Sequence, residues 1–347
     1  MGPEAFDFAL PTEQIAHAPA PQRTASRMLV LGDPPRHLHV RDLPAQLPAD
    51  ALMVVNTSKV VPARMHGVRS DGRSFELLLS APGPGQGEGA AVKAWVRRAK
   101  KLKPGEVLVV GEDALRLEYV GPDTLDPRAR VFNVVHGEVL AACKAAGEVP
   151  LPPYIERPEG PSPEDRDRYQ TVFASAEGSV AAPTAGLHLD EAMVAALDPA
   201  HVTLHVGPGT FLPMEAPDVR DHRVGAERYA IDAHNAARIQ AAREAGRPIV
   251  AVGTTATRTL EALGQGGRPI VAGESQTDLM ITPGHEFQVV THLLTNFHLP
   301  RSSLLMLVCS LGGRERVLAA YEEAVREGYR FYSYGDCMLV CPSQAGS

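Results

Sequence analysis

The sequence feature that most constrains the fold is a change in the spacing of apolar segments near residues 61 and 150. Between these positions, short apolar runs such as residues 75–79 and 115–120 alternate with Gly/Pro turns. Closely spaced short strands of this kind are typical of a small β-barrel or sandwich. Before the segment lie an irregular arm and one probable buried strand, residues 51–55. After it, longer helical patterns alternate with apolar strands, which indicates crossover connections and a largely parallel sheet.

These patterns predict an α/β fold in which a mainly parallel-sheet domain, residues 1–60 plus 151–347, is interrupted by an inserted all-β, barrel-like domain, residues 61–150. A chain of 347 residues is long enough for two domains, since single domains mostly run to roughly 100–200 residues. We expect strands at residues 51–55, 248–253, 277–281 and 329–340. We expect helices at residues 137–147, 191–197, 234–245, 254–263, 304–308 and 314–327.

The composition narrows the class of protein. A content of 44% hydrophobic and 22% charged residues is ordinary for a soluble globular protein. The N-terminal segment is acidic and lacks the apolar core of a signal peptide, and no apolar run is long enough to span a bilayer, so we expect a cytoplasmic protein. The four cysteines lack the paired spacing of a zinc site, and we expect reduced packing residues and no metal. Common nucleotide-binding and hydrolase motifs are absent from the sequence.

Two neighbouring motifs look like parts of a site. Residues 183–188 form a small-residue turn that ends in His188, and residues 205–211 read as a strand from His205 into a Gly-Pro-Gly loop. Such a unit brings histidines and free backbone N–H groups to the ends of elements, where α/β proteins usually bind ligands. Taken alone, each motif is equally consistent with turn-forming Gly and Pro and with packed histidines.

Further polar residues stand at the ends of other expected elements. Thr254, Thr255 and Arg258 follow a strand and open a helix, a geometry that can hold an anion or a ribose edge. Asn296 and His298 precede a buried helix, and Asp336 follows a glycine in the last strand. Glu215 and His222 lie beyond the Gly-Pro-Gly loop and could serve acid–base chemistry. The structural alternatives are helix caps, turns and a solvated loop.

One segment is strongly basic. It contains Arg97, Arg98, Lys100, Lys101 and Lys103, and Arg64 precedes it in the chain. The net charge of −7 describes the whole surface and leaves room for one positive face. The segment is either a solvated hairpin or a surface that contacts phosphates.

Taken together, long segments of the chain resemble the S-adenosylmethionine:tRNA ribosyltransferase-isomerase family of queuosine biosynthesis. These segments include VVNTSKVVPARMHG, RAKKLKPG, PLPPYIERP, RYQTVFASAEGSVAAPTAGLHL, HVGPGTFLPM, VAVGTTATRTLEAL, LLTNFHLPRSSLLMLV and YRFYSYGDCMLV. The resemblance covers nearly the whole chain and implies an α/β domain with an inserted β-barrel. It also implies a reaction in which the ribosyl part of S-adenosylmethionine is transferred and rearranged onto 7-aminomethyl-7-deazaguanine at the wobble position of tRNA. Adenine and methionine leave, and the product is epoxyqueuosine-tRNA.

The resemblance implies roles for the residues in the matching motifs. Acid–base catalysis is expected from five residues, with the first two as the leading candidates: His188, His205, His222, Glu215 and Asp336. S-adenosylmethionine, a co-substrate, is expected to be held by Gly186, Gly207, Gly209, Thr210, Thr254, Thr255 and Arg258. Asn296 and His298 are expected to read the modified base. The anticodon arm of the tRNA is expected to contact Arg64, Arg97, Arg98, Lys100, Lys101 and Lys103, and the protein is expected to be a monomer.

The sequence departs from the family pattern at two positions. Thr57 stands where the family usually has an aspartate, and Gly225 stands where it usually has a second histidine. These departures leave two alternatives open. One is a catalytically silent relative that binds tRNA, and the other is an α/β enzyme that acts on a free nucleoside. Release of adenine tests the first, and dependence on RNA tests the second.

Overall fold

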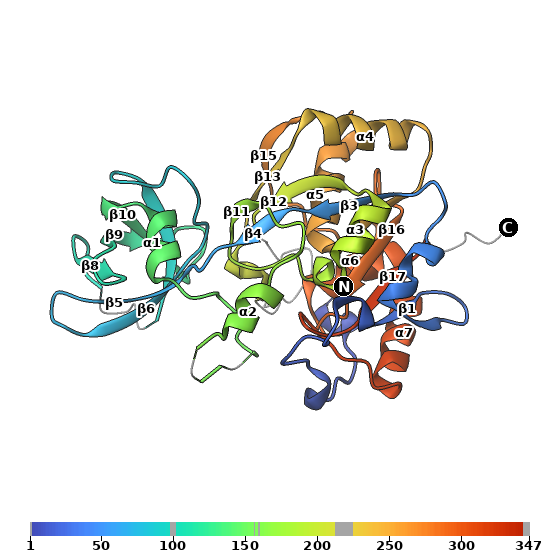
Figure 1. Cartoon of the computed structure of the whole chain (residues 1–347), viewed down its shortest axis with the longest axis horizontal. Helices are drawn as coiled ribbons and strands as arrows, with labels where there is room; N and C mark the ends of the chain where they lie inside the picture. The colour runs from blue at the N-terminus through green and yellow to red at the C-terminus, as the bar shows by residue number, and fades with distance from the viewer. Residues whose placement is uncertain (1, 98–101, 156, 159, 212–224, 343–347) are drawn as a thin grey trace.

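The computed structural model describes residues 2–97, 102–155, 157–158, 160–211 and 225–342. Within these residues the chain forms a nine-stranded sheet flanked by helices, and a closed barrel of six antiparallel strands that lies to one side of it (Figure 1). The predicted α/β fold with an inserted β-barrel is therefore confirmed. All barrel strands fall within the predicted insertion, and all strands of the large sheet fall outside it. The domain limits at residues 60 and 150 stay predictions.

The large sheet is mixed. Its strands lie in the order β15 (Gly273–Thr277), β13 (Glu227–Ile231), β12 (Ala200–Leu204), β3 (Leu52–Asn56), β14 (Ile249–Val252), β16 (His292–Asn296), β17 (Cys337–Val340), β1 (Arg27–Val30) and β2 (Arg36–His39). The four central strands, from β12 to β16, run parallel. The prediction of a mainly parallel sheet is right for this centre and wrong at the flanks, where β13, β15, β17 and β2 pair antiparallel with a neighbour. Two consecutive helices, α6 (Ser303–Gly312) and α7 (Arg314–Arg326), separate β16 from β17, and the chain re-enters the sheet at the end where β16 left it, so that β17 runs antiparallel to β16.

The remaining helices match predicted positions, except for α2, which was not predicted. They are α1 (Val139–Ala146), α2 (Pro163–Arg168), α3 (Glu191–Leu197), α4 (Ala233–Glu244) and α5 (Gly253–Gly264). Their ends follow the expected signals, since the Asp190 side chain accepts a hydrogen bond from Met193 N at the start of α3. Two short 3-10 helices also matter for the site: η6 (Thr184–His188) and η7 (Pro208–Phe211).

Two predicted strands are wrong in extent. Residues 278–281 are not in a strand, and the neighbouring strand β15 is instead built from exposed polar residues that carry no apolar alternation. Of residues 329–340, the strand takes Cys337–Val340, because the preceding chain turns at Tyr332 with a φ of 76°. A non-glycine residue with positive φ interrupts a strand and is held there by its surroundings.

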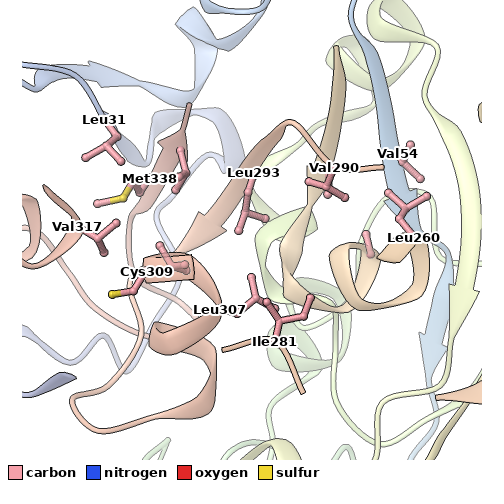
Figure 2. Packing of buried hydrophobic residues seen from close by; sticks show 14 of the residues in the cluster. Leu31, Val54, Leu260, Ile281, Val290, Leu293, Leu307, Cys309, Val317 and Met338 are labelled. Carbon is pink, nitrogen blue, oxygen red and sulfur yellow. The ribbon is translucent and has the colours of Figure 1, made fainter. Parts of the chain in front are cut away.

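The core explains why the central strands read as continuous apolar runs. Leu52 and Val54 of β3 pack into one cluster with α5 and α6, whereas Met53 and Val55 pack into another cluster with Met193 of α3. Figure 2 shows the first cluster, in which Val54 and Leu293 from the sheet lie with Leu260 of α5 and Leu307 of α6. Both faces of the sheet are covered, so both sets of side chains must be apolar.

The barrel has a core of its own. Its strands lie in the order β10 (Ala129–Gly137), β7 (Ala91–Val96), β6 (Ser74–Leu79), β5 (Arg64–Val68), β8 (Val107–Val110) and β9 (Leu115–Pro122). Leu77, Leu117 and Phe132 fill the interior, and Val139 and Cys143 of α1 pack against them. A parallel pair, β4 (Ser58–Val60) and β11 (Ala176–Ser179), lies where the chain passes between the barrel and the large sheet (Figure 1).

Three further findings concern classes of site. Across the ranges given above, no helix is long and apolar enough to cross a membrane. In the same part of the chain, no group of three or more His, Cys, Asp or Glu side chains could hold a metal ion. All four cysteines are unpaired, and Cys143, Cys309 and Cys337 are buried.

Candidate functional site

A pocket lies at the edge of the sheet where the parallel strands β3, β14 and β16 have their carboxyl ends, the usual place for a ligand in such sheets. Its walls come from η6, the start of α5, the end of β16 and the turn that contains Tyr332 and Ser333. The empty space in it is about 560 Å³ and includes space open to solvent. Several predicted ligand-binding residues line it: Thr254, Thr255, Asn296 and His298.

The start of α5 presents backbone to this pocket. Gly253 connects β14 directly to the helix with a φ of 87°, a conformation that favours glycine. No side chain caps the helix, and Gly253, Thr254 and Thr255 line the pocket. The first N–H groups of a helix have no partner within it, and they favour an oxygen-bearing or anionic ligand.

Asn56, at the end of β3, fixes the position of this helix start. Its Nδ2 donates to Leu204 O at 3.0 Å and to Thr255 Oγ1 at 3.2 Å. Its Oδ1 accepts from Leu204 N at 3.0 Å and from Ser58 N at 3.1 Å. One buried amide therefore joins β3, β12 and α5. The sequence motif pointed to this segment, but the role of Asn56 depends on distant partners.

Thr57 points away from this arrangement. Its hydroxyl lies 3.0 Å from Thr203 Oγ1 and 3.3 Å from Val202 O, and the side chain is buried. Thr57 is not among the residues that line the pocket. This departure from the family pattern thus leaves the described pocket wall unchanged. Gly225, the second departure, is exposed, and a Cβ atom there would meet no atom within 4 Å.

His188 and Asn296 are buried polar residues with unused hydrogen-bonding atoms. Neither His188 Nε2 nor Asn296 Oδ1 has a hydrogen-bond partner among the described residues, although Asn296 Nδ2 donates to Tyr332 O at 3.0 Å. Burial, together with the nearby positive charges of Arg330 and Arg23, lowers the pKa of His188 to about 4, and the Asn296 side chain opposes this shift. His188 is therefore neutral at physiological pH.

Two tyrosines of the pocket were not predicted as site residues. Tyr169 lines the pocket, and its buried hydroxyl has no partner in the described part of the chain. Tyr332 lines the pocket with a φ of 76°, and its ring centroid lies 4.3 Å from that of Tyr154. Unpaired buried polar atoms and a strained backbone both concentrate at functional sites. The signal was the glycine of the Tyr-Ser-Tyr-Gly sequence around Tyr332, because a glycine in a strand often marks a bulge or a close approach to a ligand.

His298 also lines the pocket but makes a local contact. Its Nε2 lies 2.9 Å from Thr295 Oγ1, and its backbone N donates to the Tyr321 hydroxyl at 3.1 Å. Burial lowers the pKa of His298 to about 3. The side chain is neutral and contributes a fixed hydrogen-bonding group to the pocket wall.

His205 lies outside the lining of this pocket. Val206 lines the pocket, and side chains of successive residues in extended chain point to opposite sides. A Cβ atom at Gly178 would come within 2.9 Å of His205 Nδ1, so the imidazole lies close to β11. Neither of the two leading catalytic candidates is therefore among the residues that line the pocket; His188 lies behind the lining, where the side chain of Asn296, a lining residue, acts on its pKa.

Asp336 is engaged by the backbone. One carboxylate oxygen accepts from Arg27 N at 2.9 Å and the other from Arg330 N at 2.8 Å. These contacts tie the start of β17 to the start of β1 and to the turn before Tyr332. They favour a structural role, and the predicted catalytic role of Asp336 stays a prediction.

The other residues predicted to bind S-adenosylmethionine are not among those that line the pocket. Gly186 is buried in η6, where a Cβ atom would come within 2.6 Å of Phe173 Cζ, so glycine allows the turn to pack closely. Gly207 N donates to Glu227 Oε1 at 3.2 Å, and Arg258 forms an ion pair with the same carboxylate. Gly209 and Thr210 lie in η7. Glu215 and His222 lie outside the described residues.

The basic residues lie on the barrel, apart from the pocket. Glu76 Oε1 lies 4.0 Å from Arg64 Nε, and its Oε2 lies 3.5 Å from Arg97 Nη1. Two arginines thus share one carboxylate, and the Arg97 side chain is 79% exposed. Lys103 is exposed in the turn before β8. Arg98, Lys100 and Lys101 lie outside the described residues.

Comparisons with known proteins agree with this arrangement. A family model described as "Queuosine biosynthesis protein" matches residues 3–340. A relative from Anaeromyxobacter sp. (strain Fw109-5), named S-adenosylmethionine:tRNA ribosyltransferase-isomerase, is 47% identical over 350 residues, covering 96% of this chain and 97% of the relative. One from Moorella thermoacetica with the same name is 44% identical and covers 97% of this chain and 99% of the relative. A crystal structure of the S-adenosylmethionine tRNA ribosyltransferase from Thermotoga maritima is similar with a TM-score of 0.52 and 32% identity, covering 96% and 99% of the two chains.

Proposed function

The chain belongs to the queuosine biosynthesis protein family, and from that membership we propose that it acts as an S-adenosylmethionine:tRNA ribosyltransferase-isomerase. It transfers and isomerises the ribosyl part of S-adenosylmethionine onto 7-aminomethyl-7-deazaguanine at the wobble position of tRNA. Adenine and methionine are released, and the product is epoxyqueuosine-tRNA. The observation that carries this conclusion is the similarity to named relatives over nearly the whole of both chains.

The pocket and the residues directly behind its wall provide groups that this chemistry needs, and His188 lies behind the wall next to Asn296. A proton next to the sulfonium, on C5′, must be removed, so an unprotonated base is required close to the ribose. His188 fits this requirement because it is neutral at physiological pH and its Nε2 has no partner among the described residues. A pKa of about 4 makes His188 a weak base. The acidity that the sulfonium gives to C5′ would have to compensate for this weakness.

The remaining pocket groups are suited to holding the substrates. The uncapped start of α5, with Thr254 and Thr255, presents donors for ribose or carboxylate oxygens of S-adenosylmethionine. Asn296 Oδ1 and the Tyr169 hydroxyl are unpaired within the described residues and can bind the polar edge of the modified base. His205, Asp336, Glu215 and His222 remain candidates for the later proton transfers, including the protonation that helps adenine to leave.

The tRNA would approach with its anticodon arm along the barrel. Arg64, Arg97 and Lys103, with Arg98, Lys100 and Lys101 next to them in the chain, supply positive charge for backbone phosphates. We assign the protein to the cytoplasm as a monomer. S-adenosylmethionine acts as a co-substrate in this scheme, and the reaction calls for no other cofactor.

Adenine release tests the function. The protein is mixed with S-adenosylmethionine and an anticodon stem-loop that carries either 7-aminomethyl-7-deazaguanine or guanine. Release with the modified RNA alone, with a matching gain in RNA mass, is the expected result. Binding of the modified RNA without release would instead identify a silent tRNA-binding relative. In a third mixture the free modified nucleoside replaces the RNA, and release there would identify an enzyme that does not require RNA.

A further inference from the structure

Glu227, at the start of β13, joins two walls of the pocket region. One of its carboxylate oxygens accepts from Gly207 N at 3.2 Å, and the other pairs with Arg258 Nη1. Both side chains of the ion pair are 11% exposed. A buried pair of this kind is costly to break, because removal of one partner leaves an uncompensated charge.

Arg258 is not itself among the residues that line the pocket, but it lies one turn along α5 from Thr254 and Thr255, which do, and on the same side of the helix. Its Nε donates to Leu279 O at 3.0 Å, and Nη1 is taken by Glu227. Its Nη2 is buried and has no partner among the residues that the structure describes. A guanidinium fixed at two nitrogens with a third one unused is prepared for an acceptor that arrives with a ligand.

The hydrogen bond from Gly207 N gives the Glu227 carboxylate a second link to the pocket. It directly follows Val206, which lines the pocket at the end of β12. Val206 is itself held by hydrogen bonds, from Val206 N to Ser179 Oγ at 2.9 Å and from Val180 N to Val206 O at 2.9 Å. Glu227 therefore sets the path of the chain out of β12 and the direction of the Arg258 guanidinium together.

We propose that Glu227 is a positioning residue of the S-adenosylmethionine site: it orients Arg258 so that Nη2 meets an oxygen of S-adenosylmethionine, and it holds the Gly207 backbone beside that site. Glu227 itself does not touch the substrate. This inference deepens the proposed function and rests on it.

The variant Glu227→Gln separates the charge from the shape. The amide oxygen of glutamine can still accept from Gly207 N, but the negative charge that orients Arg258 is lost. Glu261→Gln is the matched control, because Glu261 is also a buried carboxylate and lies on α5, the helix that carries Arg258. Its oxygens accept from the backbone N of Gln288, Val289 and Val290, and it does not line the pocket.

The experiment measures the Kd for S-adenosylmethionine by calorimetry, the Tm, and the kcat and KM of adenine release, for the full chain and its variants. We expect Glu227→Gln to raise the Kd and KM at least about tenfold, because the hydrogen bond from a misdirected guanidinium is lost. We expect kcat to change less than KM. Glu261→Gln should lower the Tm with its Kd within about twofold of the wild type, since distant sites act independently.

A wild-type Kd in folded Glu227→Gln would overturn the proposal. If Glu227→Gln does not fold, the double variant Glu227→Gln/Arg258→Gln removes both buried charges. It should fold and bind S-adenosylmethionine weakly, and wild-type affinity in it would also overturn the proposal. Glu227→Asp keeps the charge and should recover part of the affinity. If the wild type releases no adenine with the modified RNA, the proposed function fails, and this inference fails with it.

Discussion

His188 and His298 are kept neutral by burial, and this property defines the electrostatics of the pocket. The pKa of His188 is lowered to about 4 by burial, Arg330 and Arg23, and that of His298 is lowered to about 3 by burial. At pH 7 each imidazole is neutral, with one N–H and one nitrogen that can accept a proton. The same surroundings disfavour a protonated substrate amine, and only the neutral amine can attack.

The replacement His188→Ala tests the proposed proton acceptor. We expect turnover of adenine release to fall at least about a hundredfold, which is within the usual contribution of a general base. The Kd for S-adenosylmethionine should change little. The control is His201→Ala, which should keep normal turnover, because His201 is exposed on β12, does not line the pocket and is not a predicted site residue. Near-normal turnover in His188→Ala would show that another group accepts the proton.

The lowered pKa values also predict how stability depends on pH. Between pH 6.5 and about 4, the unfolded chain binds a proton at His188 or His298 that the folded chain does not bind. The free energy of unfolding therefore falls as the pH falls through this window, by up to about 2 kcal/mol per histidine at pH 5. Tm measured from pH 7.5 to pH 5 should decrease in the wild type and decrease less in His298→Gln. Equal slopes for the two proteins would contradict the burial argument for His298.

At the scale of elements, the pocket depends on how the ends of β3, β12 and α5 are joined. Asn56 makes this joint with four hydrogen bonds, to Leu204 N and O, Ser58 N and Thr255 Oγ1. The arrangement places the free N–H groups of α5 at the carboxyl ends of the parallel strands. A local amide therefore controls the geometry of the wall that is proposed to hold ribose oxygens.

The variant Asn56→Ala tests this joint. It leaves buried backbone groups of Leu204 without a partner, so we expect a loss of about 2–4 kcal/mol in the free energy of unfolding. Adenine release should be impaired as well, because α5 shifts. Asp190→Ala is the comparison, since it removes the single cap of α3 and should cost about 1 kcal/mol with normal turnover. Equal costs for the two variants, measured by denaturant unfolding, would refute the role given to Asn56.

The elements that the sequence predicts well carry local signals. Asp190 marks the start of α3, and the apolar run of β14 followed by Gly253 marks the change from strand to helix. The edge strand β15 has no such signal, because its exposed face needs no apolar residues. The end of the chain misled the prediction, since the turn at Tyr332 is maintained by tertiary contacts with Tyr154 and Asn296.

At the scale of the whole molecule, the predicted site residues divide between the α/β part, where four of them line the pocket, and the barrel, which carries the basic ones. Figure 1 shows the barrel to one side of the α/β part. The sequence indicated the first set through polar residues at the ends of expected elements, and the second through one strongly basic segment. It could not show that Glu227 reaches Arg258, 31 residues away, or that His205 turns from the pocket. These facts depend on strand pairing and on which face of a strand is covered.

The barrel surface predicts a salt-dependent affinity for tRNA. Replacement Arg97→Ala should weaken binding of the modified stem-loop and reduce the slope of log affinity against log salt by about 0.7–0.9, the value for one lost phosphate contact. Arg326→Ala is the control, because Arg326 is similarly exposed but lies on α7. An unchanged slope in Arg97→Ala would remove Arg97 from the proposed RNA surface.

The account as a whole depends on where S-adenosylmethionine binds. The most direct measurement is a crystal structure of the protein with S-adenosylmethionine, or with a stable analogue of it. We expect the ligand at the carboxyl ends of β3, β14 and β16, with oxygens at the start of α5 near Thr254 and Thr255 and with its C5′ within reach of His188 Nε2. A ligand bound on the barrel, or in any position that leaves His188 and the start of α5 without contact, would contradict the account.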